Sequence, residues 1–236
     1  MAISQSSVEN RLLALLPKAD FDALAPGLEL LDLPAKKILH EPNEPVEFAY
    51  FPTAGICSVI AENAEGVRSE TGVIGKEGFI GIPIVLFAGS TPAQVVVQVD
   101  GRGLRMAKED LRTAMIKSPA LLSILLRFTH IFSVQTSQTA VANSHYTINQ
   151  RLARWLLMCQ DRTNSHGFTM THEFLAVMLA VRRSGVTEAL NELEGQGIVR
   201  TTRAHISIVK RPLLEEIAGG AYGVPEQEYR RLFLQA

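Results

Sequence analysis

The spacing of apolar and polar positions changes twice along this chain. From about Leu28 to Ala107, short apolar runs at 47–51, 55–61, 69–75 and 92–101 are separated by turn-forming residues at 42–45, 62–66 and 88–91. Several short strands at this spacing are typical of an all-β sandwich or barrel. Before this region, residues 8–25 predict one short amphipathic helix, with Val8, Leu12, Leu15 and Leu16 on one side.

Residues 119–143 predict a long helix, because they contain no Gly and no Pro after Pro119. One set of positions recurs at alternating spacings of four and three, which is the seam of a coiled coil. These seam positions are Leu121, Leu125, Phe128, Phe132, Gln135 and Thr139. We interpret the helix as a dimerisation helix that pairs two copies of the chain, since an isolated helix of this length is only marginally stable. A helix that lies on its own β domain is the alternative.

After a further helix at 147–162, residues 171–199 have the layout of a helix-turn-helix. Thr171 can cap the first helix, and a short turn at 180–181 leads into a second helix from about Arg182 to Gln196. Gly197 stands where that helix should end. Residues 197–209 alternate about a basic turn and predict a β-hairpin, which would form a wing.

The amino end of the second helix carries Arg182 and Arg183, although the helix dipole is positive there and repels cations. An anion in front of this end would resolve the conflict, and DNA phosphates are such anions. Gly185 would then let the helix approach a nucleic-acid strand closely. The expected contacts to bases and phosphates are Thr171, Arg182, Arg183, Ser184, Thr187, Glu188 and Asn191, with Arg200, Arg203 and His205 on the wing. A winged module that binds a protein instead of DNA is the alternative.

The charge is distributed unevenly, although the net charge is only −1. Residues 1–146 carry 12 Lys and Arg against 15 Asp and Glu, whereas residues 147–211 carry nine against five. An acidic front and a basic rear indicate two modules with different partners. The two cysteines, Cys57 and Cys159, are far apart in sequence and do not indicate a metal site, an iron–sulfur cluster or a disulfide.

No uncharged apolar run reaches the roughly 18 residues that a membrane span needs. The first residues, MAISQSSVENRLLALL, have no basic region ahead of an apolar stretch, so they are not a secretory signal. We therefore expect a cytoplasmic protein without a membrane partner.

The segments "NQRLARWLL", "MTHEFLAVML" and "RRSGVTEALNELEGQGIV" follow a β-rich region and a long helix, and the chain in this order resembles the Crp/Fnr transcriptional regulators. The resemblance implies an α+β fold in three parts: an N-terminal β jelly-roll barrel of the cyclic-nucleotide-binding type (1–118), a dimerisation helix (119–145) and a C-terminal winged helix-turn-helix (146–236). It also implies that Arg183 reads the DNA groove. Ser184 stands where the family often has Glu, Glu188 where it often has a second Arg, and Ala180 where it usually has Gly. The operator should therefore differ from the family's best-known palindrome.

The family's cyclic-nucleotide pocket uses a Gly-Glu pair and an Arg-Ser/Thr-Ala tripeptide. Here Gly81 is followed by Ile82, and Thr91-Pro92-Ala93 stands in place of the tripeptide. A buried phosphate without its arginine lacks its strongest partner, so we expect no response to cAMP or cGMP. Glu77, Gly81, Thr91 and Gln94 are candidates to line a pocket for another effector, with ordinary barrel turns as the alternative. We expect no cofactor and no metal.

These observations predict a homodimeric, DNA-binding transcription regulator without catalytic activity. Its expected partners are a palindromic double-stranded operator, a second copy of the chain, and RNA polymerase if it is an activator; the effector is open. The first alternative is a β-barrel sensor whose winged domain binds a protein. The second is an enzyme on a β-barrel, which needs clustered ligands such as two His and a carboxylate, whereas the strand region contains only His40.

Overall fold

The structure is a computed structural model that describes residues 3–163, 167–203 and 205–234. Contacts between residues divide the chain into two compact units. The first unit comprises Met1–Val59 and Ile74–Ile131, and the second comprises Ile60–Val73 and Phe132–Ala236. Each unit is described by itself.

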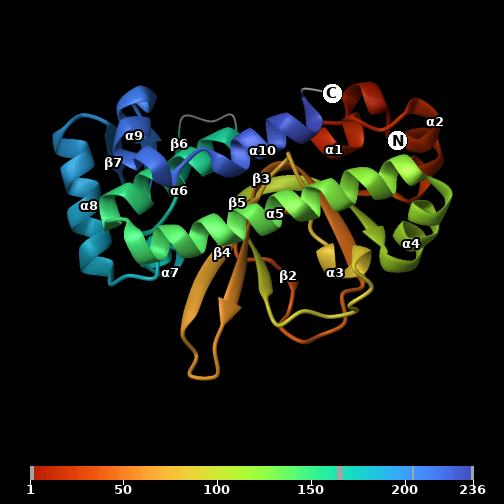
Figure 1. The fold of residues 1–236 in the computed structure, drawn as a ribbon, viewed down its shortest axis with the longest axis horizontal. Helices are drawn as coiled ribbons and strands as arrows, with labels where there is room; N and C mark the ends of the chain where they lie inside the picture. Colours follow the sequence, from red (N-terminus) through yellow and green to blue (C-terminus); the bar gives the residue numbers. More distant parts are fainter. Residues whose placement is uncertain (1–2, 164–166, 204, 235–236) are drawn as a thin grey trace. The chain divides into compact units, whose positions relative to one another are not determined.

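The β-rich region forms a sheet of five strands, in which β1 and β2 pair antiparallel with β5, and the spacing of its apolar runs predicts such short strands (Figure 1). The order is β1-β5-β3-β4, and β2 also pairs with β5. The runs at 47–51 and 55–61 belong to one long strand, in which Gly55 has a φ of +85° and closely approaches the carbonyl oxygen of Val99. The strands are β1 (Glu29–Leu33), β2 (Ile38–His40), β3 (Phe48–Glu62), β4 (Arg68–Ile74) and β5 (Gln94–Ala107).

The first unit also contains short helices. They are α1 (Arg11–Ala14), α2 (Lys18–Leu24), α3 (Ile82–Val85) and α4 (Lys108–Lys117), with 3-10 turns at Gln5–Ser7 and Ala25–Gly27. The prediction of one helix over 8–25 is wrong. Pro17 separates α1 from α2 as the N-cap of α2, because proline has no N–H to continue a preceding helix. Leu15, expected on the apolar side, is 41% exposed.

The long helix is confirmed as α5 (Pro119–His145). In the first unit its seam residues Leu121, Leu125 and Phe128 are buried, and the Phe128 ring lies 5.5 Å from that of Phe79. In the second unit Gln135 is also buried, whereas Phe132 and Thr139 are half-buried. The seam therefore packs on the chain's own residues, which is the alternative that the sequence left open.

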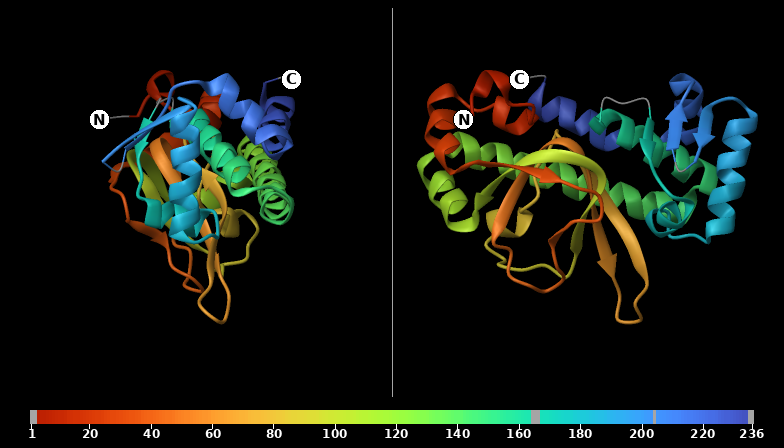
Figure 2. Two further views of the ribbon diagram at one scale, coloured as in Figure 1. Left: turned by 90° about the vertical axis from the view of Figure 1, so that its left-hand side faces the viewer. Right: turned by 180° about the vertical axis from the view of Figure 1, so that it is seen from behind.

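The second unit contains a winged helix-turn-helix, as predicted. Its helices are α6 (Ile148–Thr163), α7 (His172–Met178), α8 (Arg183–Gly195), α9 (Arg211–Ala218) and α10 (Val224–Phe233), with a 3-10 turn at Gly219–Ala221. The strands β6 (Gly167–Thr169), β7 (Val199–Thr202) and β8 (His205–Ile208) form an antiparallel sheet in the order β6-β8-β7. The hairpin of β7 and β8 lies beside α8 in all views (Figures 1 and 2).

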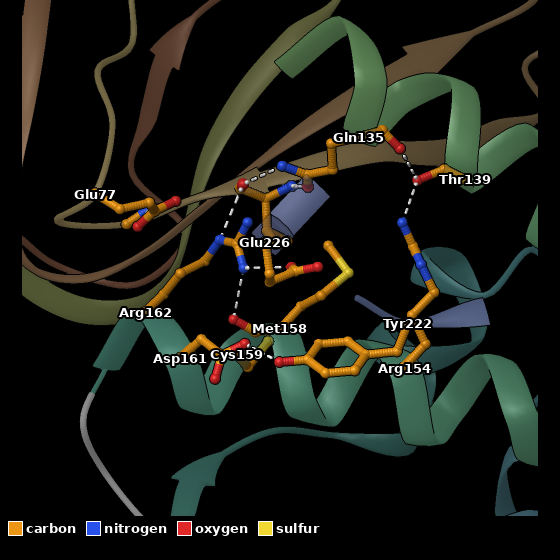
Figure 3. A network of polar contacts seen from close by, with 12 residues as sticks. Glu77, Gln135, Thr139, Arg154, Met158, Cys159, Asp161, Arg162, Tyr222 and Glu226 are labelled. Carbon is orange, nitrogen blue, oxygen red and sulfur yellow. Dashed lines mark hydrogen bonds and ion pairs between the residues drawn. The ribbon is translucent and has the colours of Figure 1, made fainter. Parts of the chain in front are cut away.

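A buried polar network joins β4, α5, α6 and α10 within the second unit (Figure 3). Arg162 donates to the backbone oxygens of Val73, at 3.3 Å, and Met158, at 2.8 Å, and its Nη1 lies 3.9 Å from Glu226. The side-chain amide of Gln135 accepts from the N–H of Val73 and donates to its carbonyl oxygen. A buried guanidinium is costly unless such partners surround it, so these elements hold one another in place.

Arg154 and Trp155 extend the network along α6. Nη2 of Arg154 donates to Oγ1 of Thr139 at 3.1 Å, and Nε1 of Trp155 donates to the buried carboxylate of Glu70 at 2.8 Å. Burial lowers the pKa of Arg154, and the carboxylates of Glu226 and Glu70 oppose that effect. Arginine stays charged in proteins, so the two carboxylates offset part of the cost of burying this cation.

A substitution at Gly78 would test how closely α5 packs against the rest of the first unit. A Cβ at this position would overlap the Phe128 ring, which is only 2% exposed and cannot move into solvent. We expect Gly78→Ala to lower the free energy of unfolding by about 2–3 kcal/mol, measured by urea denaturation. Gly195→Ala is the control, because no atom lies within 4 Å of the added methyl group. If Phe128→Leu does not relieve the loss in the double variant, the proposed overlap is wrong.

Candidate nucleic-acid interface

The helix-turn-helix is defined by its caps. Oγ1 of Thr171 accepts from the N–H of Phe174 at 3.2 Å and so caps α7, as predicted. The turn places Ala180 in the left-handed region, with a φ of +48°. At the end of α8, Gly197 has a φ of +65°, and the N–H groups of Gly197 and Ile198 bond back to Glu194 and Leu193. This is a Schellman motif, and it ends the recognition helix at the predicted residue.

Both arginines at the amino end of α8 face outward. Arg182 is the N-cap, its side chain caps nothing, and it is exposed. The side chain of Arg183 is 69% exposed and lies 3.8 Å from an equally exposed carboxylate, Glu173. An ion pair between two exposed groups contributes about 0–1 kcal/mol, so it does not neutralise this end. The positive helix terminus and two cations remain accessible to an anion.

The outer face of α8 is only partly free to read bases. Ser184, Glu188 and Asn191 are exposed, as predicted. Thr187 is half-buried, and its hydroxyl donates to the carbonyl oxygen of Arg183 while lying 2.9 Å from Nδ1 of His172. Since the hydroxyl has one hydrogen and donates it within α8, its contact with α7 has Nδ1–H of His172 as the donor.

The wing is attached to the recognition helix by a carboxylate. Glu194 accepts from the backbone N–H and the hydroxyl of Thr201, and these bonds lower the pKa of Glu194. Arg200 and Arg203 are exposed, whereas His205 is half-buried. Beside the wing, a cavity of about 270 Å³ is lined by Met170, His172, Thr201, Thr202, Arg203, His205 and Ile206. The wing thus presents cations around a polar hollow.

The basic excess of residues 147–211 is smaller at the surface than the sequence indicates. Arg154 and Arg162 are buried in the polar network. Arg211 pairs with Asp161 at 2.9 Å, and Arg151 donates to the carbonyl oxygen of Leu179 at the end of α7. The exposed cations of this segment are Arg182, Arg183, Arg200, Arg203 and Lys210. They flank the recognition helix and the wing.

Gly185 has a different role from the one expected. A Cβ on Gly185 would lie 3.0 Å from Cδ1 of Ile148 in α6. The missing side chain therefore eases the packing of α8 against Ile148 of α6, and close approach to a nucleic-acid strand stays a prediction.

Three residues of this region were missed by sequence reasoning. His172 lines the cavity and holds Thr187, Glu194 holds the wing, and Arg151 places a cation at the negative end of α7. The contact of Arg151 with Leu179 joins residues 28 apart in the chain, so no sequence signal pointed to it. The other two also depend on contacts across elements.

Comparison with known proteins gives two domain matches. Residues 30–118 match the cyclic nucleotide-binding domain, and residues 150–217 match the Crp-like helix-turn-helix domain. The chain belongs to the Crp/Fnr family of transcriptional regulators. Members of this class are regulators rather than enzymes. The comparison with curated proteins found no match to this sequence.

Solved structures share the fold of this Crp/Fnr protein. FixK2 from Bradyrhizobium japonicum is 16% identical with a TM-score of 0.69, over 82% of this chain and 98% of that one. A Crp/Fnr regulator from Thermus thermophilus is 21% identical with a TM-score of 0.66, over 80% and 98%. The c-di-GMP-responsive regulator CLP from Xanthomonas campestris is 14% identical with a TM-score of 0.65, over 81% and 99%.

The four effector candidates of this Crp/Fnr protein all have partners in its own barrel. Both carboxylate oxygens of Glu77 accept from the N–H of Gly75, and Gly81 has a φ of +132° with no room for a side chain beside Ala49. Thr91 accepts from the N–H of Ala93, and Gln94 donates to Glu41. Glu77 and Thr91 thus bond within turns, Gly81 precedes α3 and Gln94 begins β5, and an effector role remains a prediction.

Cys57 is buried in the first unit, and burial raises the pKa of its thiol to about 12. The thiol is therefore held in its unreactive protonated form. Among the described residues, no group of three or more His, Cys, Asp or Glu side chains is placed to hold a metal ion. In the same residues, no single helix is long and apolar enough to cross a membrane; α4 and α5 pass that test only as a pair bent by 115°.

A substitution at Ala180 would test whether the turn of the helix-turn-helix is strained. A residue with a Cβ loses about 1–2 kcal/mol in the left-handed region, and Gly recovers it at a smaller entropic cost. We expect Ala180→Gly to raise the free energy of unfolding by about 0.5–1 kcal/mol, measured by urea denaturation. Ala140→Gly in the exposed interior of α5 is the control and should lower it by about 1 kcal/mol. A loss of stability in both variants would show that the turn is not strained.

Proposed function

We propose that this protein regulates transcription by binding double-stranded DNA through α8 and the wing. The observation that carries the proposal is the amino end of α8, where Arg182 and Arg183 are exposed without a neutralising partner of comparable strength. Backbone N–H groups and cations at a helix start attract phosphates. Contacts from the outer face of a helix in the major groove would then supply sequence specificity.

The exposed residues divide into two groups by position. Arg183, Ser184, Glu188 and Asn191 lie on the helix and would read base edges, with Arg182 near the backbone. Thr171 before α7 and Arg200 and Arg203 on the wing, with half-buried His205, would bind phosphates, which carry no sequence information directly. Thr187 would act indirectly by fixing α8 on α7.

We further propose that two copies pair through α5, so that the two recognition helices read a palindromic operator. Half-sites about one helical turn, or roughly 34 Å, apart would fit such a dimer. The seam residues are buried in the single chain, so the pairing face would be the exposed one. Leu126 and Val141 on this face are 43% and 44% exposed. An activator of this kind would also contact RNA polymerase.

The proposed insensitivity to cAMP is supported by the barrel turn at Thr91. Its hydroxyl is used within the turn, and Pro92 follows where the family has a polar residue. A phosphate there would lack a guanidinium to bind it.

Measurements of DNA binding would test whether α8 reads bases while the wing binds phosphates. Duplexes selected from a random pool would define the preferred sequence, and fluorescence anisotropy would measure affinity for it and for unrelated DNA. We expect Arg183→Ala to weaken binding to the preferred sequence by about 1–3 kcal/mol and to relax specificity. Arg203→Ala should weaken binding to both DNAs alike and reduce the salt dependence by about one ion.

Arg231→Ala is the control, because this exposed arginine of α10 pairs with Glu228. Equal, sequence-independent losses in Arg183→Ala and Arg203→Ala would contradict the division of roles. No binding to any duplex even at low salt, where phosphate contacts dominate, would overturn the proposal and favour a protein partner for the winged domain.

The oligomeric state tests the pairing face of α5. A charge at Leu126 or Val141 would be buried in the proposed dimer without a partner, so Leu126→Glu and Val141→Glu should give monomers in light scattering. Ile116→Glu on α4, at a position 81% exposed, is the control and should remain dimeric. Dimers in both test variants would place the interface elsewhere.

A further inference from the structure

A cavity of about 240 Å³ opens in the first unit between α2, α4 and the start of α5. Figure 1 shows these helices beside one another. None of its lining residues belongs to the barrel turns at Glu77, Gly81, Thr91 and Gln94. The cavity is therefore separate from the four candidate effector residues of the barrel.

The inner wall of this cavity is apolar. Leu24, Met106 and Leu121 contribute to it, and each is at most 4% exposed. Gly27 stands at the wall without a side chain, and a Cβ there would lie 3.1 Å from Cε of Met106. An aliphatic group of modest size would lose its contact with water against these residues.

The polar part of the wall carries charges of both signs that lack ionic partners. Asp20 accepts one hydrogen bond, from the hydroxyl of Ser118 at 2.9 Å. Asp110 and Lys117, on α4, are exposed at the edge of the cavity, and neither forms a hydrogen bond or ion pair with a described side chain. The half-buried carboxylate of Asp20 and these two exposed charged groups thus line one small hollow.

We propose that this cavity binds a small zwitterion, an α-amino acid with an aliphatic side chain. Its ammonium group would lie between Asp20 and Asp110, its carboxylate at Lys117, and its side chain against Leu24, Met106 and Leu121. Pockets for drug-sized ligands have about 300–1,000 Å³, so the smaller volume here restricts the occupant to this size. Opposite charges at the two ends of the ligand fix its orientation.

The occupant would act on the start of α5. The Ser118 hydroxyl that donates to Asp20 also accepts from the N–H of Leu121, at 3.0 Å, and so caps this helix. A ligand ammonium that competes for Asp20 changes the electrostatics of that cap. The site thereby connects a small molecule to the helix through which we propose dimerisation, but its binding is independent of the proposed DNA contacts.

Isothermal titration calorimetry on the full chain, without DNA, tests the site with three probes of similar shape: leucine, 3-methylbutylamine and 4-methylpentanoate. Leucine should bind most tightly, because it alone has both charged groups. Asp110→Asn should weaken leucine and the amine at least about tenfold. Lys117→Met should weaken leucine by a similar factor and leave the amine unchanged.

Glu109→Gln is the matched control, since Glu109 lies next to Asp110 in the first turn of α4 but pairs with Arg112 and does not line the cavity. Thermal unfolding of each variant without ligand establishes that it is folded. Equal binding of all three probes, unchanged leucine affinity in folded Asp110→Asn, or no leucine binding up to about 10 mM would overturn the proposal. A failure here leaves the DNA measurements unaffected, and the reverse also holds.

Discussion

The two buried arginines of α6 impose the constraint on which the second unit depends. Arg154 and Arg162 are each 6% exposed, so their guanidinium groups must find partners inside the protein. Those partners lie on β4, α5 and α10, through the backbone oxygen of Val73, the hydroxyl of Thr139 and the carboxylate of Glu226. Loss of one partner would leave a charge buried and unsatisfied, which is strongly destabilising. The network therefore fixes the position of α6 relative to β4, α5 and α10.

Helix α8, the second helix of the helix-turn-helix, is held against α6 and α7 by contacts of single side chains. Gly185 admits Ile148 of α6, and Thr187 bonds to His172 of α7. On the far side, Glu194 holds the wing. Because these contacts use the inner face and the end of α8, Arg182 and Arg183 at its beginning remain exposed. The same packing that fixes the helix leaves its charged end available to a ligand.

Local sequence patterns predicted those helices and strands whose limits depend on a few neighbouring residues. Alternation marked the strands, and Thr171 and Gly197 marked the ends of helices because caps depend on a few adjacent residues. The prediction of one helix over 8–25 was wrong because Pro17 interrupts the helix, although the apolar spacing continues past it. The spacing along α5 predicted a seam between two copies, whereas Leu121, Leu125, Phe128 and Gln135 are buried within the chain and Phe132 and Thr139 are half-buried. Periodicity shows only that a face is apolar and not which surface buries it.

The sequence by itself determined the class of fold, the helix-turn-helix and the position of two cations at the start of its second helix, since periodicity, caps and turns are encoded locally. Only the tertiary structure decided which cations are free. It buried Arg154 and Arg162, tied Arg151 to the end of α7, and left Arg182 exposed. The reason is that burial and pairing depend on contacts between residues far apart in the chain, and charge counts along a sequence contain no information about them.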